Sequence, residues 1–111
     1  MNITPENYGQ VTVLSLRGEF TVDDVENFQR VVKERLGGDV REFVIDLEKV
    51  PFIDSAAMEA LLELHDQAAE RAGAVRLAAC DENVSKILEM TRLNQQFETF
   101  PDLIEAVKSF R

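Results

Sequence analysis

Residues 43–64, FVIDLEKVPFIDSAAMEALLEL, contain a strand pattern followed directly by a helix pattern. Phe43 to Leu47 is a nearly continuous apolar run, which is typical of a strand that is covered on both faces. After a short loop, apolar residues recur at helical spacing and predict a helix from about Ser55 to Ala72. Asp54 and Ser55 stand at the start of that helix. Both are good N-cap residue types, so either side chain can accept a hydrogen bond from a free N–H group of the first turn.

Helix and strand patterns also alternate on both sides of this unit. Before it, residues 1–4 and 11–17 are expected to form a hairpin, with Pro5 ending the first strand and a turn at Tyr8–Gly9. The other predicted elements are a helix from Thr21 to Gly37 that Thr21 and Asp24 cap, strands at 74–79 and 97–100, a helix capped by Asp81 or Asn83, and a last helix with Pro101 as its first residue. The predicted apolar stripes are Met58, Leu61, Leu62, His65, Ala68 and Ala72 on the helix after Ser55, and Leu103, Ile104, Val107 and Phe110 on the last helix.

This alternation predicts an α/β fold with a mixed, mainly parallel sheet of four to five strands and about four helices. With 111 residues in the chain, we expect a single domain over residues 1–111. Binding sites of parallel sheets lie at the carboxyl ends of the strands. Residues 48–55 and 80–83 follow two of the predicted strands, so we expect both segments to lie at this ligand-facing edge of the sheet.

Composition and charge restrict the possible partners. The chain has a formal net charge of -9 and a sequence pI near 4.5, so it would be repelled by nucleic acid and by anionic lipid. No stretch approaches the ~20 apolar residues that span a bilayer, and the start of the chain lacks the pattern of a secretory signal. A single cysteine, Cys80, fits a reducing compartment. We therefore expect a cytoplasmic domain that binds another protein, with no nucleic-acid partner and no direct membrane binding.

The residues that most often carry catalysis do not form a pattern here. Carboxylates follow Cys80 and would raise the pKa of its thiol, which disfavours a nucleophile. His65, the only histidine, lies among apolar residues and is expected to be structural. Asp46, Glu48 and Asp54 are a weak candidate for a magnesium site, and no glycine-rich phosphate loop is present. The sequence therefore predicts no enzyme, no metal and no cofactor.

Asp54–Ser55 has two interpretations. In the first, one of the two residues is only a helix cap, which is worth about 1 kcal/mol. In the second, the exposed Ser55 hydroxyl accepts a phosphate. Free N–H groups and the helix dipole would stabilise a phosphate at this position. The phosphate would add about -1.5 to -2 charges to the surface and would repel a bound partner without unfolding the domain.

Several stretches resemble the STAS domain family of anti-sigma factor antagonists. Phe52 to Leu62 (FIDSAAMEALL) is similar to the family signature, in which Asp-Ser is followed by Ser or Thr, Gly and Leu. Val11 to Phe20 resembles the second strand of the family and the turn after it, and Phe43 to Leu47 resembles the strand before the phosphorylation loop. Val75 to Ala78 and the helix after it also fit the family pattern.

The resemblance implies a non-enzymatic switch in which Ser55 is the phosphorylation site. In the family, the kinase is an anti-sigma factor that the unphosphorylated antagonist binds, and a PP2C-type phosphatase removes the phosphate. Ala56 and Ala57 depart from the family pattern, since they replace its second hydroxyl residue and its glycine. The partner-binding residues that the resemblance implies are Asp54, Ser55, Ala56, Ala57, Met58 and Glu59.

The resemblance leaves an alternative open. Some STAS proteins are adaptors that bind their partner without phosphorylation, such as the STAS-like subunits of lipid-transport ABC complexes. An adaptor would use the same loop and helix, and Ser55 would remain unmodified.

Overall fold

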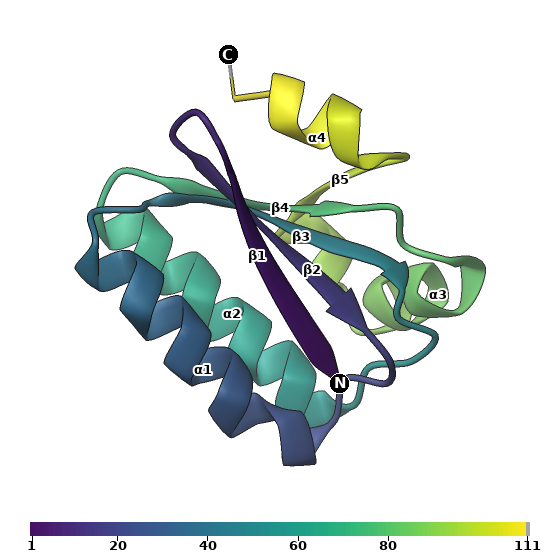
Figure 1. The fold of residues 1–111 in the computed structure, drawn as a ribbon. Coiled ribbons are helices and arrows are strands. Elements are labelled where there is room, and N and C mark those ends of the chain that lie inside the picture. The colour runs from purple at the N-terminus through teal and green to yellow at the C-terminus, as the bar shows by residue number, and fades with distance from the viewer. Residues whose placement is uncertain (111) are drawn as a thin grey trace.

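The five strands form one sheet in the order β1-β2-β3-β4-β5 (Figure 1). This arrangement is seen in a computed structural model, which describes residues 1–110. The first two strands are antiparallel and every other neighbouring pair is parallel, so the predicted α/β fold with a mixed, mainly parallel sheet is confirmed. The strands are β1 (Asn2–Tyr8), β2 (Val11–Arg17), β3 (Glu42–Lys49), β4 (Ala74–Ala78) and β5 (Glu98–Phe100).

Helices cover the two faces of the sheet unequally. The helices α1 and α2 run side by side on one face, with α3 beside them, and only the short α4 lies on the other face (Figure 1). No helix among residues 1–110 is both long enough and apolar enough to cross a membrane. The helices are α1 (Val22–Gly37), α2 (Ser55–Glu70), α3 (Glu82–Met90) and α4 (Leu103–Lys108), with a 3₁₀ turn at Leu93–Gln95.

The start of α1 matches its sequence prediction. Thr21 is the N-cap, and the Asp24 carboxylate accepts hydrogen bonds from the Thr21 N–H at 3.1 Å and from its hydroxyl at 3.3 Å. For α3 the sequence left two caps open, and the structure selects Asp81, whose carboxylate accepts from the Val84 N–H at 2.7 Å. These short-range signals were readable from the sequence because each bond joins residues that are three positions apart.

Two predicted boundaries are wrong. Pro5 lies inside β1 and does not end it, because β1 is an edge strand and an edge tolerates a residue without an N–H group. Pro101 is not the first residue of α4. That helix begins at Leu103, because the Asp102 carboxylate caps it by accepting from the Glu105 N–H at 2.8 Å.

The inward faces of two helices also differ from the predicted stripes. In α2, the buried set is Ala57, Ala60, Leu61, Leu64 and Ala68, whereas the predicted Met58, Leu62 and His65 are only half-buried and Ala72 lies beyond the helix. In α4, Ala106 is fully buried and Ile104 is 65% exposed. Alanine faces inward in both helices because its small side chain lets the helix backbone pack close to the sheet.

Candidate functional site

The loop before α2 is held firmly at the carboxyl end of the sheet. The Phe20 N–H donates to the Phe52 carbonyl oxygen at 3.0 Å, and the Asp54 N–H donates to the Phe20 carbonyl oxygen at 3.1 Å. On its other side, Asn83 Nδ2 donates to the Pro51 carbonyl oxygen at 2.7 Å. Segments 48–55 and 80–83 therefore both lie at the carboxyl end of the sheet, as the sequence predicts, and the structure adds a hydrogen bond by which the start of α3 holds the loop.

Asp54 connects the starts of two helices. Its Oδ1 accepts a hydrogen bond from the Ala57 N–H at 2.8 Å, which makes Asp54 the N-cap of α2. Its Oδ2 accepts from the Val22 N–H, the first residue of α1, at 2.9 Å. Both bonds satisfy N–H groups that have no partner within their own helix. Asp54 thus fixes the first turn of α1 relative to the first turn of α2.

Ser55 is the first residue of α2, and it is exposed. The N-terminus of a 16-residue helix carries a partial positive charge from the aligned peptide dipoles. Because Asp54 already caps the helix, the Ser55 hydroxyl is not needed for capping. Its position therefore combines access from solvent with a local field that favours an anion.

The rest of the predicted partner-binding stretch divides between the surface and the core. Glu59 is exposed, one turn after Ser55, while Ala56 and Met58 are half-buried. Ala57 is fully buried and belongs to the main hydrophobic core. The methyl group that replaces the family's glycine therefore packs inside the domain and does not narrow the space that is open to a partner.

Two further residues at this end were missed by the sequence reading. Val22 is 63% exposed and Phe52 is 39% exposed, although both side chains are apolar. Both lie beside Asp54: Val22 through the hydrogen bond to its N–H, and Phe52 two residues earlier in the loop. The apolar residues of α1 that recur at helical spacing are Val25, Phe28, Val32 and Leu36, and Val22 is outside this set, which is the signal in the sequence that its side chain has no place in the core.

His65 and Asp46, which the sequence offered as candidates for chemistry, make contacts within the fold. The His65 ring lies edge-on to the ring of Phe97, with their centroids 5.3 Å apart. The Asp46 carboxylate accepts from the Glu48 N–H at 3.1 Å and from the Ser15 hydroxyl at 3.4 Å. Among residues 1–110, no group of three or more His, Cys, Asp or Glu side chains is placed to hold a metal ion.

Cys80 is predicted to be an unreactive thiol. Burial raises its pKa to about 11, and the neighbouring Asp81 carboxylate adds to the rise. The thiolate is the reactive form, so at pH 7.5 we expect alkylation by iodoacetamide about a hundredfold slower than for the same chain unfolded in urea. Mass spectrometry of timed samples measures both rates. Equal rates in the folded and the unfolded chain would show that Cys80 is not shielded.

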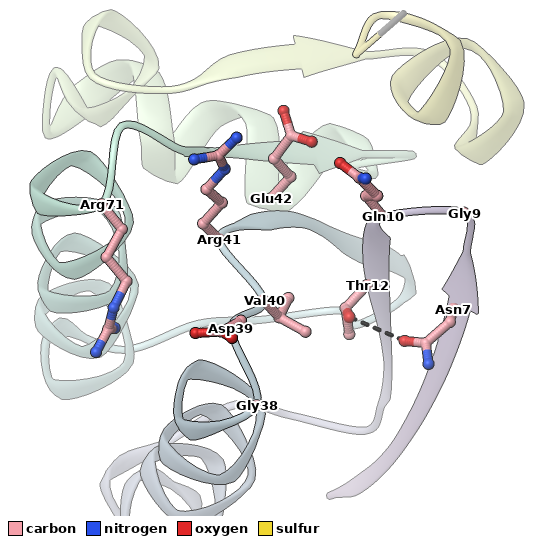
Figure 2. A pocket seen from close by; sticks show the side chains of 10 residues that line it. All are labelled: Asn7, Gly9, Gln10, Thr12, Gly38, Asp39, Val40, Arg41, Glu42 and Arg71. Carbon is pink, nitrogen blue, oxygen red and sulfur yellow. Dashed lines mark hydrogen bonds between the residues drawn. The ribbon is translucent and has the colours of Figure 1, made fainter.

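A hollow lies at the end of the sheet opposite to Ser55, where the parallel strands begin (Figure 2). It has a volume of about 560 Å³, and within it the buried Thr12 hydroxyl donates to Asn7 Oδ1 at 2.9 Å. Figure 2 shows the two arginine side chains of the lining pointing away from each other, so they do not converge on one anion. The carboxylates of Asp39 and Glu42, which also line the hollow, balance the positive charge of Arg41 and Arg71. The Ser55 end is therefore the better candidate site.

Comparison with known proteins agrees with the resemblance in the sequence. The chain is 32% identical over 94 residues to a STAS-domain containing protein of Pseudomonas aeruginosa strain UCBPP-PA14, a match that covers 85% of this chain and 92% of that protein. The fold of this chain is similar to that of the Bacillus anti-sigma factor antagonist SpoIIAA in its unphosphorylated form, with a TM-score of 0.86. The two chains are 20% identical, and the match covers 99% of this chain and 96% of SpoIIAA. A structure of SpoIIAA in the phosphorylated form matches as well.

A protein of a different kind shares the same fold. The sulfate transporter family protein from Wolinella succinogenes has a TM-score of 0.80 and 17% identity, over 90% of this chain and 84% of that one. At such identities the structural matches show the fold alone. Family membership comes from the sequence, because the STAS domain family matches residues 2–106 and the Pseudomonas relative exceeds 30% identity. The chain therefore belongs to the STAS domain family.

Proposed function

We propose that this protein is a non-enzymatic switch that binds another protein, acts as an anti-sigma factor antagonist, and is controlled by phosphorylation of Ser55. The main supporting observation is the exposed Ser55 at the first position of α2, beside a separate cap residue. SpoIIAA, which has the same fold, is known in an unphosphorylated and a phosphorylated form. Ser55 is also the only hydroxyl-bearing residue between Val50 and Glu70, so this end of α2 offers one acceptor.

The proposed partners are two enzymes, a kinase and a phosphatase. A serine kinase that is also an anti-sigma factor transfers the γ-phosphoryl group of ATP to the Ser55 oxygen, with loss of the hydroxyl proton and release of ADP. The unphosphorylated protein binds this kinase in the cytoplasm and thereby frees the sigma factor. A PP2C-type phosphatase restores Ser55 by hydrolysing the phosphate ester with water, which releases inorganic phosphate.

The phosphate is expected to weaken binding of the partner much more than it changes the stability of the fold. The N–H groups and the dipole at the start of α2 stabilise the anion within the domain. Toward a partner, the phosphate adds about -1.5 to -2 charges to a protein whose formal net charge is already -9. Close contact at Ser55 would then leave the phosphate desolvated against groups that were matched to a neutral hydroxyl.

A second candidate is a constitutive adaptor that binds through the same end and is never phosphorylated. The similarity of the fold to the Wolinella sulfate transporter family protein favours this class, since there a STAS-like fold occurs in a transport protein. An adaptor in a lipid-transport ABC complex would be one example. The two candidates differ in whether charge at Ser55 changes binding.

The test uses three forms of the protein as baits in lysate of the native host. Wild type and Ser55→Ala are expected to capture the same kinase, because neither carries charge at that position. Ser55→Asp is expected to capture at least tenfold less kinase, since the cost of desolvating a carboxylate against groups that were matched to a neutral hydroxyl exceeds about 1.4 kcal/mol. Quantitative mass spectrometry measures the captured protein.

Urea unfolding of the three baits serves as the control for folding. Similar midpoints are expected, because an acidic residue in the first turn of α2 is compatible with the helix dipole. If Ser55→Asp captures the same protein as strongly as wild type, the switch is refuted and the adaptor is favoured.

A further inference from the structure

Val22 and Phe52 are apolar side chains left exposed at the Ser55 end. Val22 is 63% exposed on the first turn of α1, and Phe52 is 39% exposed in the loop before α2. They are two of only five large apolar side chains that residues 1–110 expose, and both lie beside Asp54. Exposed apolar side chains that gather at one place are typical of an interaction surface, whereas scattered ones need no explanation.

Negative charge predominates around these two side chains. Segments 18–29 and 50–70, which contain the starts of α1 and α2, hold nine carboxylates, and the nearest basic residues in sequence at this end are Arg17 and Lys49, which pair at the ends of β2 and β3. Glu19, Asp23, Glu26 and Glu59 are the exposed carboxylates closest in sequence to Val22 or Ser55. A mainly acidic surface of this kind attracts a positively charged surface and repels nucleic acid and anionic lipid.

The position of Val22 relative to Ser55 is fixed by the backbone. The Asp54 carboxylate accepts hydrogen bonds from the Val22 N–H at 2.9 Å and from the Ala57 N–H at 2.8 Å. Phe52 is tied to the same place because its carbonyl oxygen accepts from the Phe20 N–H at 3.0 Å. A surface that is already ordered loses little conformational entropy on binding.

We propose that Val22 and Phe52 are the apolar anchors of the surface that binds the protein partner. The partner presents an apolar recess that is surrounded by lysine and arginine side chains. Interfaces of this kind have an apolar centre, which contributes most of the affinity, and a charged rim, which contributes orientation and association rate. The proposal rests on the proposed function for the identity of the partner, and it extends the binding surface from α2 to the start of α1.

The experiment measures the affinity of the purified kinase that wild type captures. Phe52→Ala is expected to weaken binding at least tenfold and Val22→Ala severalfold, since both remove apolar area from the centre of the interface. Ile104→Ala is the matched control, because Ile104 is 65% exposed on α4, on the opposite face of the sheet. It is expected to bind like wild type. Isothermal titration calorimetry at low and at high NaCl gives the affinities, and the affinity of wild type is expected to fall with salt.

The outcomes separate this proposal from the proposed switch. If Ser55→Asp weakens binding while Val22→Ala and Phe52→Ala do not, the anchors are refuted and the switch stands. If both alanine variants weaken binding while Ser55→Asp does not, the surface stands and the switch fails. If affinity is independent of salt, the basic rim of the partner is refuted. Equal binding by all variants, or no captured kinase, refutes both proposals. Urea midpoints equal to that of wild type confirm that each variant is folded.

Discussion

The Gly73→Ala variant is expected to lose about 3 kcal/mol of its free energy of unfolding. A Cβ atom at Gly73 would lie 1.9 Å from the carbonyl oxygen of Arg41 and 2.6 Å from its carbonyl carbon. Both atoms are backbone, so no side-chain rotation relieves the collision. The same carbonyl oxygen accepts from the Ala74 N–H at 3.1 Å where β3 and β4 begin to pair. The chain must therefore separate the end of α2 from β3 or distort the sheet.

Gly37→Ala is the matched control for this variant. An added Cβ at Gly37 meets nothing within 4 Å, and Gly37 is the last residue of α1. Its replacement is expected to be neutral or to stabilise the protein by up to about 1 kcal/mol, because alanine favours the helix. Urea unfolding followed by circular dichroism measures both variants. A Gly73→Ala midpoint within error of wild type would show that the approach of Gly73 to Arg41 is not required.

The sequence predicted the alternation of strands and helices because that information is local. Periodic apolar residues and cap residues act over three or four positions, and α1, β2 and β3 follow them closely. Gly73 directly follows the predicted end of the helix at Ala72, but the sequence did not give the reason why glycine is required at this position. Ala72 adopts the left-handed conformation, with φ of 59°, while Gly73 leaves space for the backbone of a distant strand.

The inward face of α2 was predicted less well for a different reason. Alanine and leucine residues occur on several sides of α2, so more than one face of the helix has similar hydrophobicity. The choice between them depends on how closely the helix can approach the sheet, which favours small side chains such as Ala57, Ala60 and Ala68. Periodicity alone does not include that distance.

In the candidate site, too, some residues could be predicted from local sequence, whereas others depend on tertiary contacts. Ser55 and Asp54 were found because a helix start has a short-range signature. The contact of Asp54 with Val22 joins residues 32 positions apart, and no pattern in either segment indicates it. The exposure of Val22 and Phe52 follows from the same packing of two helix starts at the end of the sheet. The candidate residue Ser55 was thus predictable from the sequence, whereas the extent of the proposed binding surface around it was not.

Asp54→Ala is expected to lower the free energy of unfolding by about 2–3 kcal/mol, more than an ordinary cap removal. An ordinary N-cap satisfies one helix, and its loss costs about 1 kcal/mol. Asp54 satisfies the Ala57 N–H with one oxygen and the Val22 N–H with the other, so alanine leaves a free N–H at the start of each helix. Urea unfolding measures the total loss, and hydrogen exchange at these two amides identifies which helix start has opened.

Two further variants separate the contributions. Asp81→Ala removes a cap that serves only the Val84 N–H, at 2.7 Å, and is expected to cost about 1 kcal/mol. Asp54→Asn keeps one acceptor oxygen but places an NH₂ group where the second oxygen was, so we expect an intermediate loss with faster exchange at Val22 than at Ala57. If Asp54→Ala costs no more than Asp81→Ala, the bond to Val22 contributes nothing to stability. The start of α1 would then be tied to the loop before Ser55 through the two Phe20 hydrogen bonds and not through the Asp54 carboxylate.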